Sequence, residues 1–253
     1  MPLVTAVLVV IFGLAVGSFL NVCIYRLPLR QSILWPSSRC PGCQTPLRWY
    51  HNLPVVSYIA LRGRCHTCHA PISPMYPLVE SATAVLFLGA FFTFGPSLLV
   101  PRLLFVCAML VLFVIDLRHR ILPNGITLPG IVAGFLFSLF LPPGWLDSLI
   151  GIVAGSGVLL LIAETYSRIR GEEGLGMGDV KMLAMIGAFL GWKLMLVTLV
   201  LSSFLGSIVG LGMIALGKGN MKYALPFGTF LAVGAIVATV AGDDLLGWYL
   251  SFY

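Results

Sequence analysis

The sequence predicts an all-α polytopic membrane protein with about eight transmembrane helices and a cytoplasmic zinc-binding insert between helices 1 and 2. Three observations lead to this prediction: the composition, a series of long apolar runs, and one polar segment rich in cysteine. The chain has 253 residues, of which 59% are hydrophobic and 9% are charged, and its mean hydropathy is +1.02. Because soluble domains carry about 25% charged residues, this composition excludes an ordinary soluble enzyme, a disordered protein and a nucleic-acid-binding protein.

The first apolar run covers residues 1–24 and holds no Lys, Arg, Asp or Glu. A secretory signal peptide would begin with a basic segment and end in a small-residue cleavage site, and neither feature occurs before Arg26. We therefore expect this run to be an uncleaved first transmembrane helix.

Seven further apolar runs follow a polar segment at 25–77. They cover residues 78–95, 101–115, 125–141, 145–164, 180–191, 194–216 and 227–250. The run at 180–191 would extend only about 18 Å, which is short of the roughly 30 Å hydrocarbon core. The last run contains Asp243 and Asp244, so we expect its spanning part to end near Ala241. No period in the sequence suggests an internal repeat.

The placement of basic residues supports eight crossings, including the short one. With the N-terminus outside, the loops at 25–77, 116–124, 165–179 and 217–226 all face the cytoplasm. These loops or their flanks hold every Lys and Arg except Arg102 and Lys193. The distribution follows the positive-inside rule, and it accounts for the net charge of +6 without a nucleic-acid partner.

The polar segment at 25–77 carries six arginines, no acidic residue and two Cys-x-x-Cys pairs. Cys40 pairs with Cys43, Cys65 pairs with Cys68, and 21 residues separate the two pairs. Two such pairs in one small loop are typical of structural zinc sites, where each pair forms a tight turn and the four thiolates complete a tetrahedron. Because four thiolates close the coordination sphere, we expect the metal to fold the loop rather than to catalyse.

Other interpretations of these cysteines are less favoured. Residues 65–69 also spell the CxxCH motif of haem attachment, but haem is attached outside the cytoplasm, and Cys40 and Cys43 would have no role. Disulfides conflict with a cytoplasmic location, where thiols stay reduced. Either His66 or His69 could replace one cysteine as a ligand.

Two aspartates fall at predicted cytoplasmic ends of helices. Asp116 ends the third helix and Asp179 opens the sixth, and an acid at the membrane edge is costly unless it is paired or used. Two carboxyl groups close together in a poorly solvated site share one proton, as in an aspartic protease. There the ionised partner activates water and the protonated one polarises the scissile carbonyl. Gly176 and Gly178, just before Asp179, suit a backbone that lets an extended peptide come close.

The same aspartates allow a purely structural interpretation. Asp179 at a helix start could be an N-cap, and either aspartate could pair with Arg118, Arg120 or Lys181. The spacing alone leaves both interpretations open. Nucleotide binding at the Gly-rich run is only weakly indicated, because the run lacks the GxGxxG and GxxxxGK[ST] patterns and follows no predicted strand.

Taken together, these motifs resemble the bifunctional type 4 prepilin peptidases, or leader peptidase/N-methyltransferases, over nearly the whole chain. The resemblance includes both CxxC pairs and the segments 17–28, 49–54, 61–65, 71–73 and 76–80. It also includes Asp116 followed by Ile121-Leu122-Pro123-Asn124, and Gly176-Met177-Gly178-Asp179. The last is the GxGD motif shared with presenilin-like intramembrane aspartic proteases.

The resemblance implies two reactions at the bacterial cytoplasmic (inner) membrane, with the active site on the cytoplasmic side. The first removes the basic leader of type IV prepilins or type II secretion pseudopilins after a glycine. The second methylates the new N-terminal amine, usually of Phe, with S-adenosylmethionine. The implied catalytic residues are Asp116 and Asp179, the supporting motif residues Gly176, Gly178, Pro123 and Asn124, and the zinc ligands Cys40, Cys43, Cys65 and Cys68.

We expect three parts in the chain. They are a first transmembrane helix (1–24), a zinc-binding insert associated with methylation (25–77) and a polytopic membrane peptidase domain (78–253). Relatives that only cleave lack the insert, so its presence favours methylation, although no residue marks the methyl-donor pocket. Candidate substrate-binding residues are Glu80, for the substrate amine, and Glu172 and Glu173, for the basic leader. For Glu80, a plain helix-start charge is an equal alternative.

Two other classes of function compete with the peptidase. A transporter or channel could use Asp116 and Asp179 as proton or cation sites, but many transporters have repeated halves, and none is evident. A zinc-bearing membrane scaffold without catalysis is the other alternative. Only the peptidase interpretation predicts that replacing either aspartate leaves folding intact and abolishes cleavage.

Overall fold

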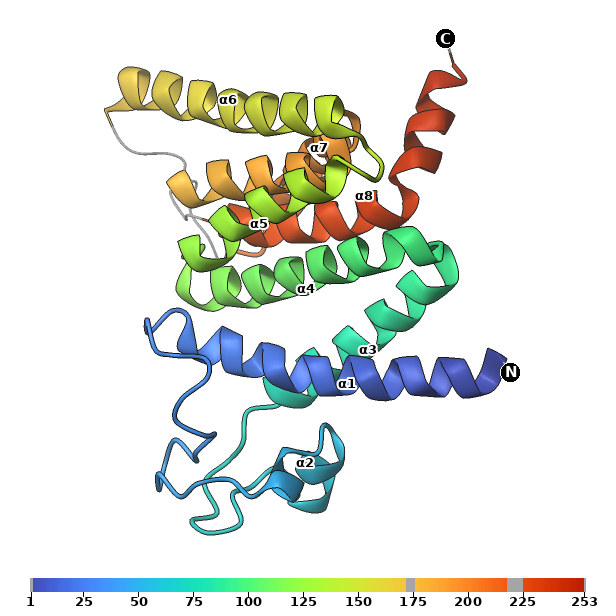
Figure 1. The fold of residues 1–253 in the computed structure, drawn as a ribbon. Coiled ribbons are helices and arrows are strands. Elements are labelled where there is room, and N and C mark those ends of the chain that lie inside the picture. The colour runs from blue at the N-terminus through green and yellow to red at the C-terminus, as the bar shows by residue number, and fades with distance from the viewer. Residues whose placement is uncertain (1, 172–175, 218–224, 253) are drawn as a thin grey trace. The chain divides into compact units, whose positions relative to one another are not determined.

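The structure is a computed structural model that describes residues 2–171, 176–217 and 225–252. Within these ranges it contains helices and loops but no β-strand, only two isolated β-bridges. A short 3-10 helix, η1, covers Trp49–Asn52. The α-helices (Figure 1) are α1 (Pro2–Arg26), α2 (Val56–Ala60), α3 (Met75–Thr93), α4 (Pro96–His119), α5 (Asn124–Ser138), α6 (Trp145–Arg170), α7 (Met177–Ala215) and α8 (Phe227–Leu250).

The all-α prediction is confirmed for the described residues, and all eight predicted apolar segments are helical. Two of them, 180–191 and 194–216, both fall within α7, where a non-helical residue, Gly191, separates them. Six helices are long and apolar enough to cross a membrane, which agrees with a multi-pass membrane protein. Helix α5 has only 15 residues, so the number of eight crossings stays a prediction.

The chain forms two compact units, Met1–Gly95 and Pro96–Tyr253. The first contains α1, α3 and the insert between them, and the second contains α4 to α8. The apolar character of residues 78–95 groups them with the later helices in the sequence, but α3 packs on α1 instead. The predicted division at residue 77 concerns function, and the packing does not test it.

In the first unit, α1 and α3 pack closely through two glycines of α1. A Cβ added to Gly13 would lie 2.7 Å from the Cα of Ala84, and one added to Gly17 would lie 2.7 Å from the Cα of Glu80. Small residues at these positions let the two backbones approach. The insert connects the C-terminal end of α1 to the start of α3 and carries η1 and α2 (Figure 1).

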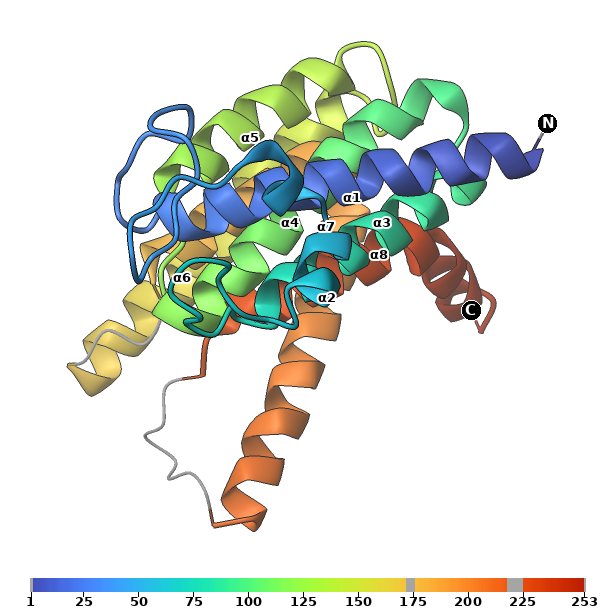
Figure 2. The ribbon, with the colours of Figure 1, turned by 90° about the horizontal axis from the view of Figure 1, so that it is seen from below.

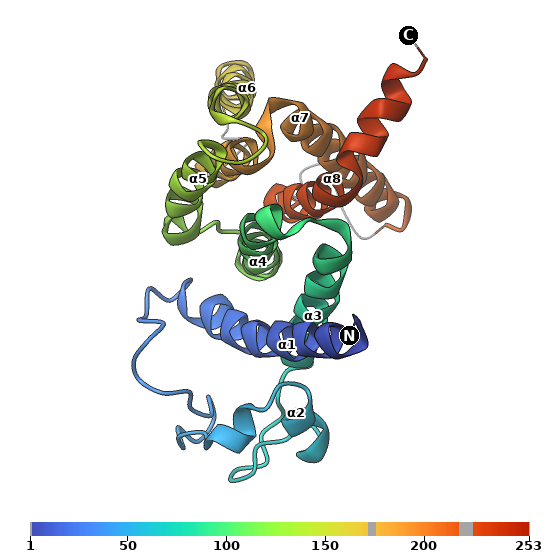
Figure 3. The ribbon, with the colours of Figure 1, turned by 45° about the vertical axis from the view of Figure 1, so that its right-hand side comes forward.

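The second unit is built around the first half of α7. Helices α5, α6 and α8 all contact α7, and α4 packs on α8 (Figure 3). The side chains between Val180 and Leu190 are buried apart from Lys181, and a helix that is buried all round belongs to a protein interior. The segment 180–191 can therefore be shorter than a lipid-facing helix, because protein encloses it.

Helix α7 changes direction at Gly191, where φ is 78° and ψ is 171°. A positive φ favours glycine, and a Cβ at this position would also lie 2.9 Å from Cβ of Pro143. The two segments that the sequence predicts as separate helices are therefore two helical segments within α7, and they meet at the non-helical residue Gly191. The second half runs in a different direction from the first and extends away from the other helices of the unit (Figure 2).

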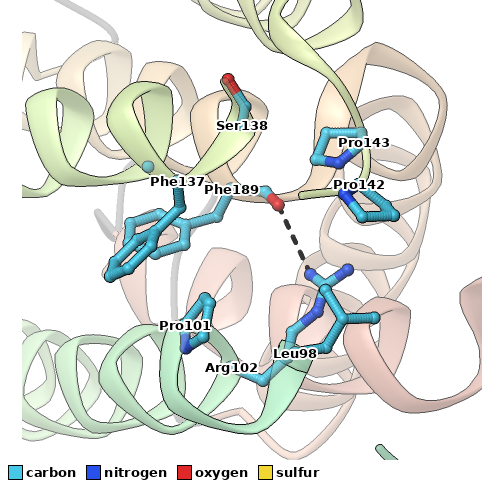
Figure 4. Close-up of a pocket in the computed structure, with 9 residues that line it drawn as sticks. Leu98, Pro101, Arg102, Phe137, Ser138, Pro142, Pro143 and Phe189 are labelled. Carbon is cyan, nitrogen blue, oxygen red and sulfur yellow. Dashed lines mark hydrogen bonds between the residues drawn. The ribbon is translucent and has the colours of Figure 1, made fainter. Parts of the chain in front are cut away.

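Side chains from neighbouring helices bond to two carbonyl groups just before the kink. Ser148 Oγ donates to the carbonyl of Ala188 at 2.9 Å, and Nη1 of Arg102 donates to the carbonyl of Phe189 at 3.4 Å. Figure 4 shows the second bond beside a small cavity between α4, α5 and α7. Arg102 lies about 21 Å along α4 from Asp116, so this cavity is separate from the aspartates.

Candidate active site and metal centre

Asp116 lies in the last turn of α4, and its residue surface is 5% exposed. Arg120, the residue after the end of α4, has a left-handed φ of 54°. Its N–H donates to the carbonyl of Asp116 at 2.8 Å, which terminates the helix in a common C-cap conformation. The charge of Arg120 also interacts electrostatically with the Asp116 carboxylate.

The start of α8 holds the carboxylate of Asp116. Its Oδ2 atom accepts a hydrogen bond from the backbone N–H of Thr229 at 2.7 Å and another from Thr229 Oγ1 at 3.0 Å. A Cβ at Gly228 would lie 3.0 Å from the same oxygen. The glycine therefore leaves room for the carboxylate to reach the N-terminus of α8.

Asp179 is the third residue of α7, and Gly176 is the N-cap. The carboxylate of Asp179 accepts a hydrogen bond from the N–H of Gly176, as the acid of a capping box does. In return, the N–H of Asp179 donates to the carbonyl of Gly176 at 3.1 Å. Asp179 is therefore not the N-cap, as the structural alternative proposed, although it does stabilise the start of the helix.

The N-termini of α7 and α8 meet at one residue of the loop after α4. A Cβ on Gly178 would lie 2.9 Å from Cβ of Leu122, and one on Gly228 would lie 2.9 Å from Cδ1 of the same leucine. Leu122 therefore separates the two helix starts by one side chain. Asp116 and Asp179 are consequently close enough for their charges to interact.

The remaining motif residues line the same region. Nζ of Lys181 donates to Oδ1 of Asn124 at 3.0 Å, so one turn of α7 is tied to the start of α5. Pro123 is the N-cap of α5, and its carbonyl accepts the N–H of Thr127 at 3.3 Å. The N-termini of α5, α7 and α8 and the C-terminal end of α4 are therefore linked by contacts in one region, which contains the two aspartates.

This arrangement can carry out acid–base chemistry on a peptide. Two interacting carboxyl groups cannot both ionise easily, so one holds a proton while the other accepts one. A water molecule between them could lose a proton to the ionised group while the protonated group polarises a carbonyl. Asp116 and Asp179 both carry carboxyl groups, and these groups lie close enough together for this chemistry.

The four predicted metal ligands also come together, in the first unit. Their Sγ atoms all lie within 4.8 Å of one another, with 3.8 Å between Cys40 and Cys68 and 4.0 Å between Cys43 and Cys65. Tetrahedral zinc with bonds of about 2.3 Å to sulfur requires S···S edges of about 3.8 Å. These distances fit a metal site with four cysteine ligands. They are too long for the S–S bond of a disulfide, which is about 2.05 Å.

The environment of Cys65 favours a thiolate, whereas burial and the three neighbouring cysteines raise the pKa of the Cys68 thiol to about 11. Hydrogen bonds from the backbone N–H groups of Cys68 and Thr67 lower the pKa of the Cys65 thiol to about 6, and thiolates are the form that binds metal. The N–H of Thr67 lies 3.4 Å from this sulfur. His66 and His69 are exposed and outside the cluster, so the arrangement favours four cysteine ligands over a set that includes a histidine.

The two cysteine turns repeat one another at an offset of 25 residues. The N–H of Cys40 donates to the carbonyl of Thr45 at 3.0 Å, and that of Cys65 donates to the carbonyl of Ala70 at 2.9 Å. The bridges Arg39↔Pro46 and Arg64↔Pro71 obey the same offset. We expected no internal repeat, and this expectation is wrong for the insert.

Glu80 lies in α3 with 7% of its surface exposed. Its Oε2 accepts the N–H of Val55 at 2.8 Å, and its carboxylate also hydrogen-bonds to Ser18 and Asn21 of α1. Val55 has a φ of 60°, which is rare for a β-branched residue and needs support from its surroundings. Glu80 therefore ties the insert to both helices of its unit, and its proposed role in binding the substrate amine stays a prediction.

Two further candidates, Glu172 and Glu173, lie outside the described residues. The structure adds one residue that the sequence did not single out for the site, Thr229, and it shows Lys181 bonded to Asn124. Thr229 carries no signal in the sequence, because it is an ordinary helix residue 113 positions from Asp116. Lys181 is indicated by the sequence only as a possible ion-pair partner.

Comparison with known families divides the chain as the structure does. Residues 11–94 match the Bacterial Peptidase A24 N-terminal domain, and residues 103–211 match the Type IV leader peptidase family. The boundary between the two matches falls where the two compact units meet in the sequence. No solved structure matches the chain.

Several curated proteins are similar over most of their length. One from Aeromonas hydrophila is 38% identical over 272 residues, which cover 96% of this chain and 93% of that protein. One from Pseudomonas putida is 36% identical over 266 residues, which cover 94% of this chain and 91% of that protein. One from Myxococcus xanthus is 44% identical over 222 residues, which cover 86% of this chain and 66% of that protein. All three are named prepilin leader peptidase/N-methyltransferase.

Proposed function

Because the chain belongs to the type IV leader peptidase family, we propose that it cleaves the leader from type IV prepilins and pseudopilins and then methylates the new N-terminus. One observation supports the cleavage reaction most strongly. Asp116, near the end of α4, lies close to Asp179, in the first turn of α7, where the starts of α7 and α8 come together. A transporter that uses the same aspartates is not favoured, because the relatives are named as enzymes.

For cleavage, the two aspartates act as a general base and a general acid. The ionised carboxylate takes a proton from water as the water oxygen attacks the carbonyl carbon of the last leader residue, the glycine. The protonated carboxyl group gives its proton to the carbonyl oxygen, and the collapse of the tetrahedral intermediate returns a proton to the leaving amine. The exposed backbone at Gly176 leaves room for an extended substrate beside the pair, whereas Gly178 is packed against Leu122.

For methylation, S-adenosylmethionine supplies an electrophilic methyl group to the free amine that cleavage creates. The insert at 25–77 is the part of the chain that we associate with this step. No dinucleotide-type fingerprint occurs in the sequence, and we assign no residue to the methyl-donor pocket.

Zinc is the metal that best suits the four-cysteine cluster. Cys40, Cys43, Cys65 and Cys68 would hold it, and four thiolates leave no open position for a substrate. Between residues 27 and 74 the only buried residues are Cys40 and Cys65. The insert therefore lacks an apolar core, and a metal would supply the stability that such a core normally provides.

The location follows from the same reasoning. A multi-pass protein with its arginine-rich insert on one side obeys the positive-inside rule if that side is the cytoplasm. We therefore propose the bacterial inner membrane, with the aspartates at its cytoplasmic face. Glu172 and Glu173 are proposed to attract the basic leader. Replacing both with Gln should raise KM in a salt-dependent way, and an unchanged KM would contradict that role.

The test is mass spectrometry of a type IV prepilin after incubation with the purified protein in detergent, with and without S-adenosylmethionine. We expect loss of the leader with the wild type and not with Asp116→Ala or Asp179→Ala. A gain of one methyl group on the new N-terminus only when the methyl donor is present establishes the second activity. An intact prepilin in every sample, with folded and zinc-loaded protein, would overturn the proposal for that substrate.

A further inference from the structure

The N-terminus of α8 lacks the side-chain cap that a helix start usually has. Its N-cap is Pro226, which makes no side-chain hydrogen bond. The first N–H groups of any helix have no partner inside the helix, and that of Thr229 is one of them. Asp116 satisfies it at 2.7 Å, from a position 113 residues earlier in the chain.

The contact between Asp116 and Thr229 is buried on both sides. Asp116 is 5% exposed and Thr229 is 6% exposed, so water does not compete freely for either group. The hydroxyl of Thr229 adds a second hydrogen bond to the same Oδ2 atom at 3.0 Å. The positive end of the α8 dipole also lies at this position, where it stabilises a negative charge.

The two aspartates therefore have different surroundings. Asp116 accepts two hydrogen bonds from another helix and interacts with the positive charge of Arg120. Asp179 accepts one bond, from Gly176 at the start of its own helix, and faces the charge of Asp116. Donors and a cation around a carboxylate favour its ionised form.

We propose that Thr229 is a positioning residue that keeps Asp116 as the ionised member of the pair, so that Asp116 is the base and Asp179 is the acid. This inference rests on the proposed function and assigns the two roles within it. A carboxylate oxygen offers about two acceptor positions, and Thr229 fills those of Oδ2. The other oxygen, Oδ1, is then the atom that takes the proton from the attacking water.

The test compares Thr229→Val, which keeps the N–H and loses the hydroxyl, with Thr229→Ser, which keeps both donors. A hydrogen bond to a charged group is worth about 1.5–3 kcal/mol, so we expect Val to lower kcat by about 10- to 100-fold. KM should stay within about twofold, and the acidic limb of the pH profile should move to higher pH. Ser should restore most of kcat.

Thr239→Val is the matched control. Thr239 lies on the same helix and is also 6% exposed, but its hydroxyl bonds to the carbonyl of Ala235. We expect this variant to match the wild type in kcat and in pH profile. If Thr229→Val matches the wild type as well, or if Ser is as impaired as Val, the proposal is overturned.

A measurement without turnover separates this inference from the proposed function. In an Asp179→Asn background, infrared spectroscopy follows the carboxylate band that a further Asp116→Asn change removes. Adding Thr229→Val should make this group protonate at a higher pH, because its ionised form loses a donor. An unmoved midpoint would overturn the inference even in an active enzyme. A moved midpoint in a protein that cuts no prepilin would support it while the proposed function fails.

Discussion

The metal centre and the aspartate site of this protein are built in opposite ways. The four cysteines lie within one loop of the chain, and two short turns with the same hydrogen bonds present them. The aspartates and Thr229 come from three different helices, and Asp116 and Thr229 are 113 residues apart. The first site is local in the sequence, whereas the second exists only once the helices have packed.

The two sites also differ in what stabilises them. The insert buries only Cys40 and Cys65 between residues 27 and 74, so the metal that we propose would stabilise it in place of an apolar core. The aspartate site lies in a unit with an extensive apolar core that includes Phe105, Met182 and Leu231. We therefore expect loss of the cysteine ligands to unfold the insert without stopping cleavage, and loss of an aspartate to stop cleavage without unfolding the insert. Variants of either site can test this.

The largest expected effect is on cleavage alone. Asp116→Asn and Asp179→Asn should each lower kcat for leader removal by about 100- to 10,000-fold, because one proton-transfer group is lost. Both variants should still methylate a pilin whose leader has already been removed. Mass spectrometry of the uncut and the precut substrate measures both activities, and loss of methylation in both variants would show that the two sites are not separate.

The converse change is the removal of the metal. In Cys40→Ser with Cys65→Ser, zinc content should fall from about one per chain to nearly none, because two of four ligands are gone. Trypsin should then cut the exposed arginines of the insert about tenfold faster or more. Elemental analysis and timed proteolysis measure these effects.

The control for metal removal is leader cleavage by the same protein. We expect kcat to stay within about threefold of the wild type, since the two sites belong to separate compact units and changes at sites that share no partners usually act independently. A collapse of cleavage together with the metal would mean that the two sites depend on each other.

A smaller effect is expected from crowding the aspartate site. In Gly228→Ala the added Cβ would lie 3.0 Å from Oδ2 of Asp116 and 2.9 Å from Leu122. Overpacking of this kind costs about 1–3 kcal/mol, so kcat should fall about tenfold as the carboxylate is displaced. Gly247→Ala on the same helix has open space around it and should behave as the wild type in activity and thermal unfolding.

The smallest expected effect concerns the anchor of the insert. Glu80→Ala leaves the buried N–H of Val55 without its acceptor, which costs about 1–3 kcal/mol and should loosen the insert. Glu80→Gln keeps an oxygen acceptor and should be nearly neutral. Protease sensitivity of the insert separates the two variants. If Gln is as disruptive as Ala, the negative charge matters, and the predicted binding of a substrate amine gains support.

Some features of the site were available from the sequence, and others were not. The CxxC spacing predicted the four-cysteine cluster, and the repeated pattern Arg-Cys-x-x-Cys-x-x-Pro at residues 39–46 and 64–71 was also there to be found. The role of Thr229 was not, because nothing in the sequence indicates which helix start would face Asp116. Nor did the sequence reveal that Glu80 supports the unusual backbone of Val55.

The sequence by itself determined the membrane class, the helical segments and the cluster of four cysteines, and it singled out the two aspartates, because apolar runs and short-range spacing are local properties. The tertiary structure decided that 180–191 and 194–216 meet in a sharp break at Gly191, that α3 pairs with α1, and which donors reach Asp116. These outcomes depend on contacts between residues far apart in the chain. Several packings of the same helices would satisfy the same hydropathy pattern, and only close fits such as Gly187 against Gly151 select one of them.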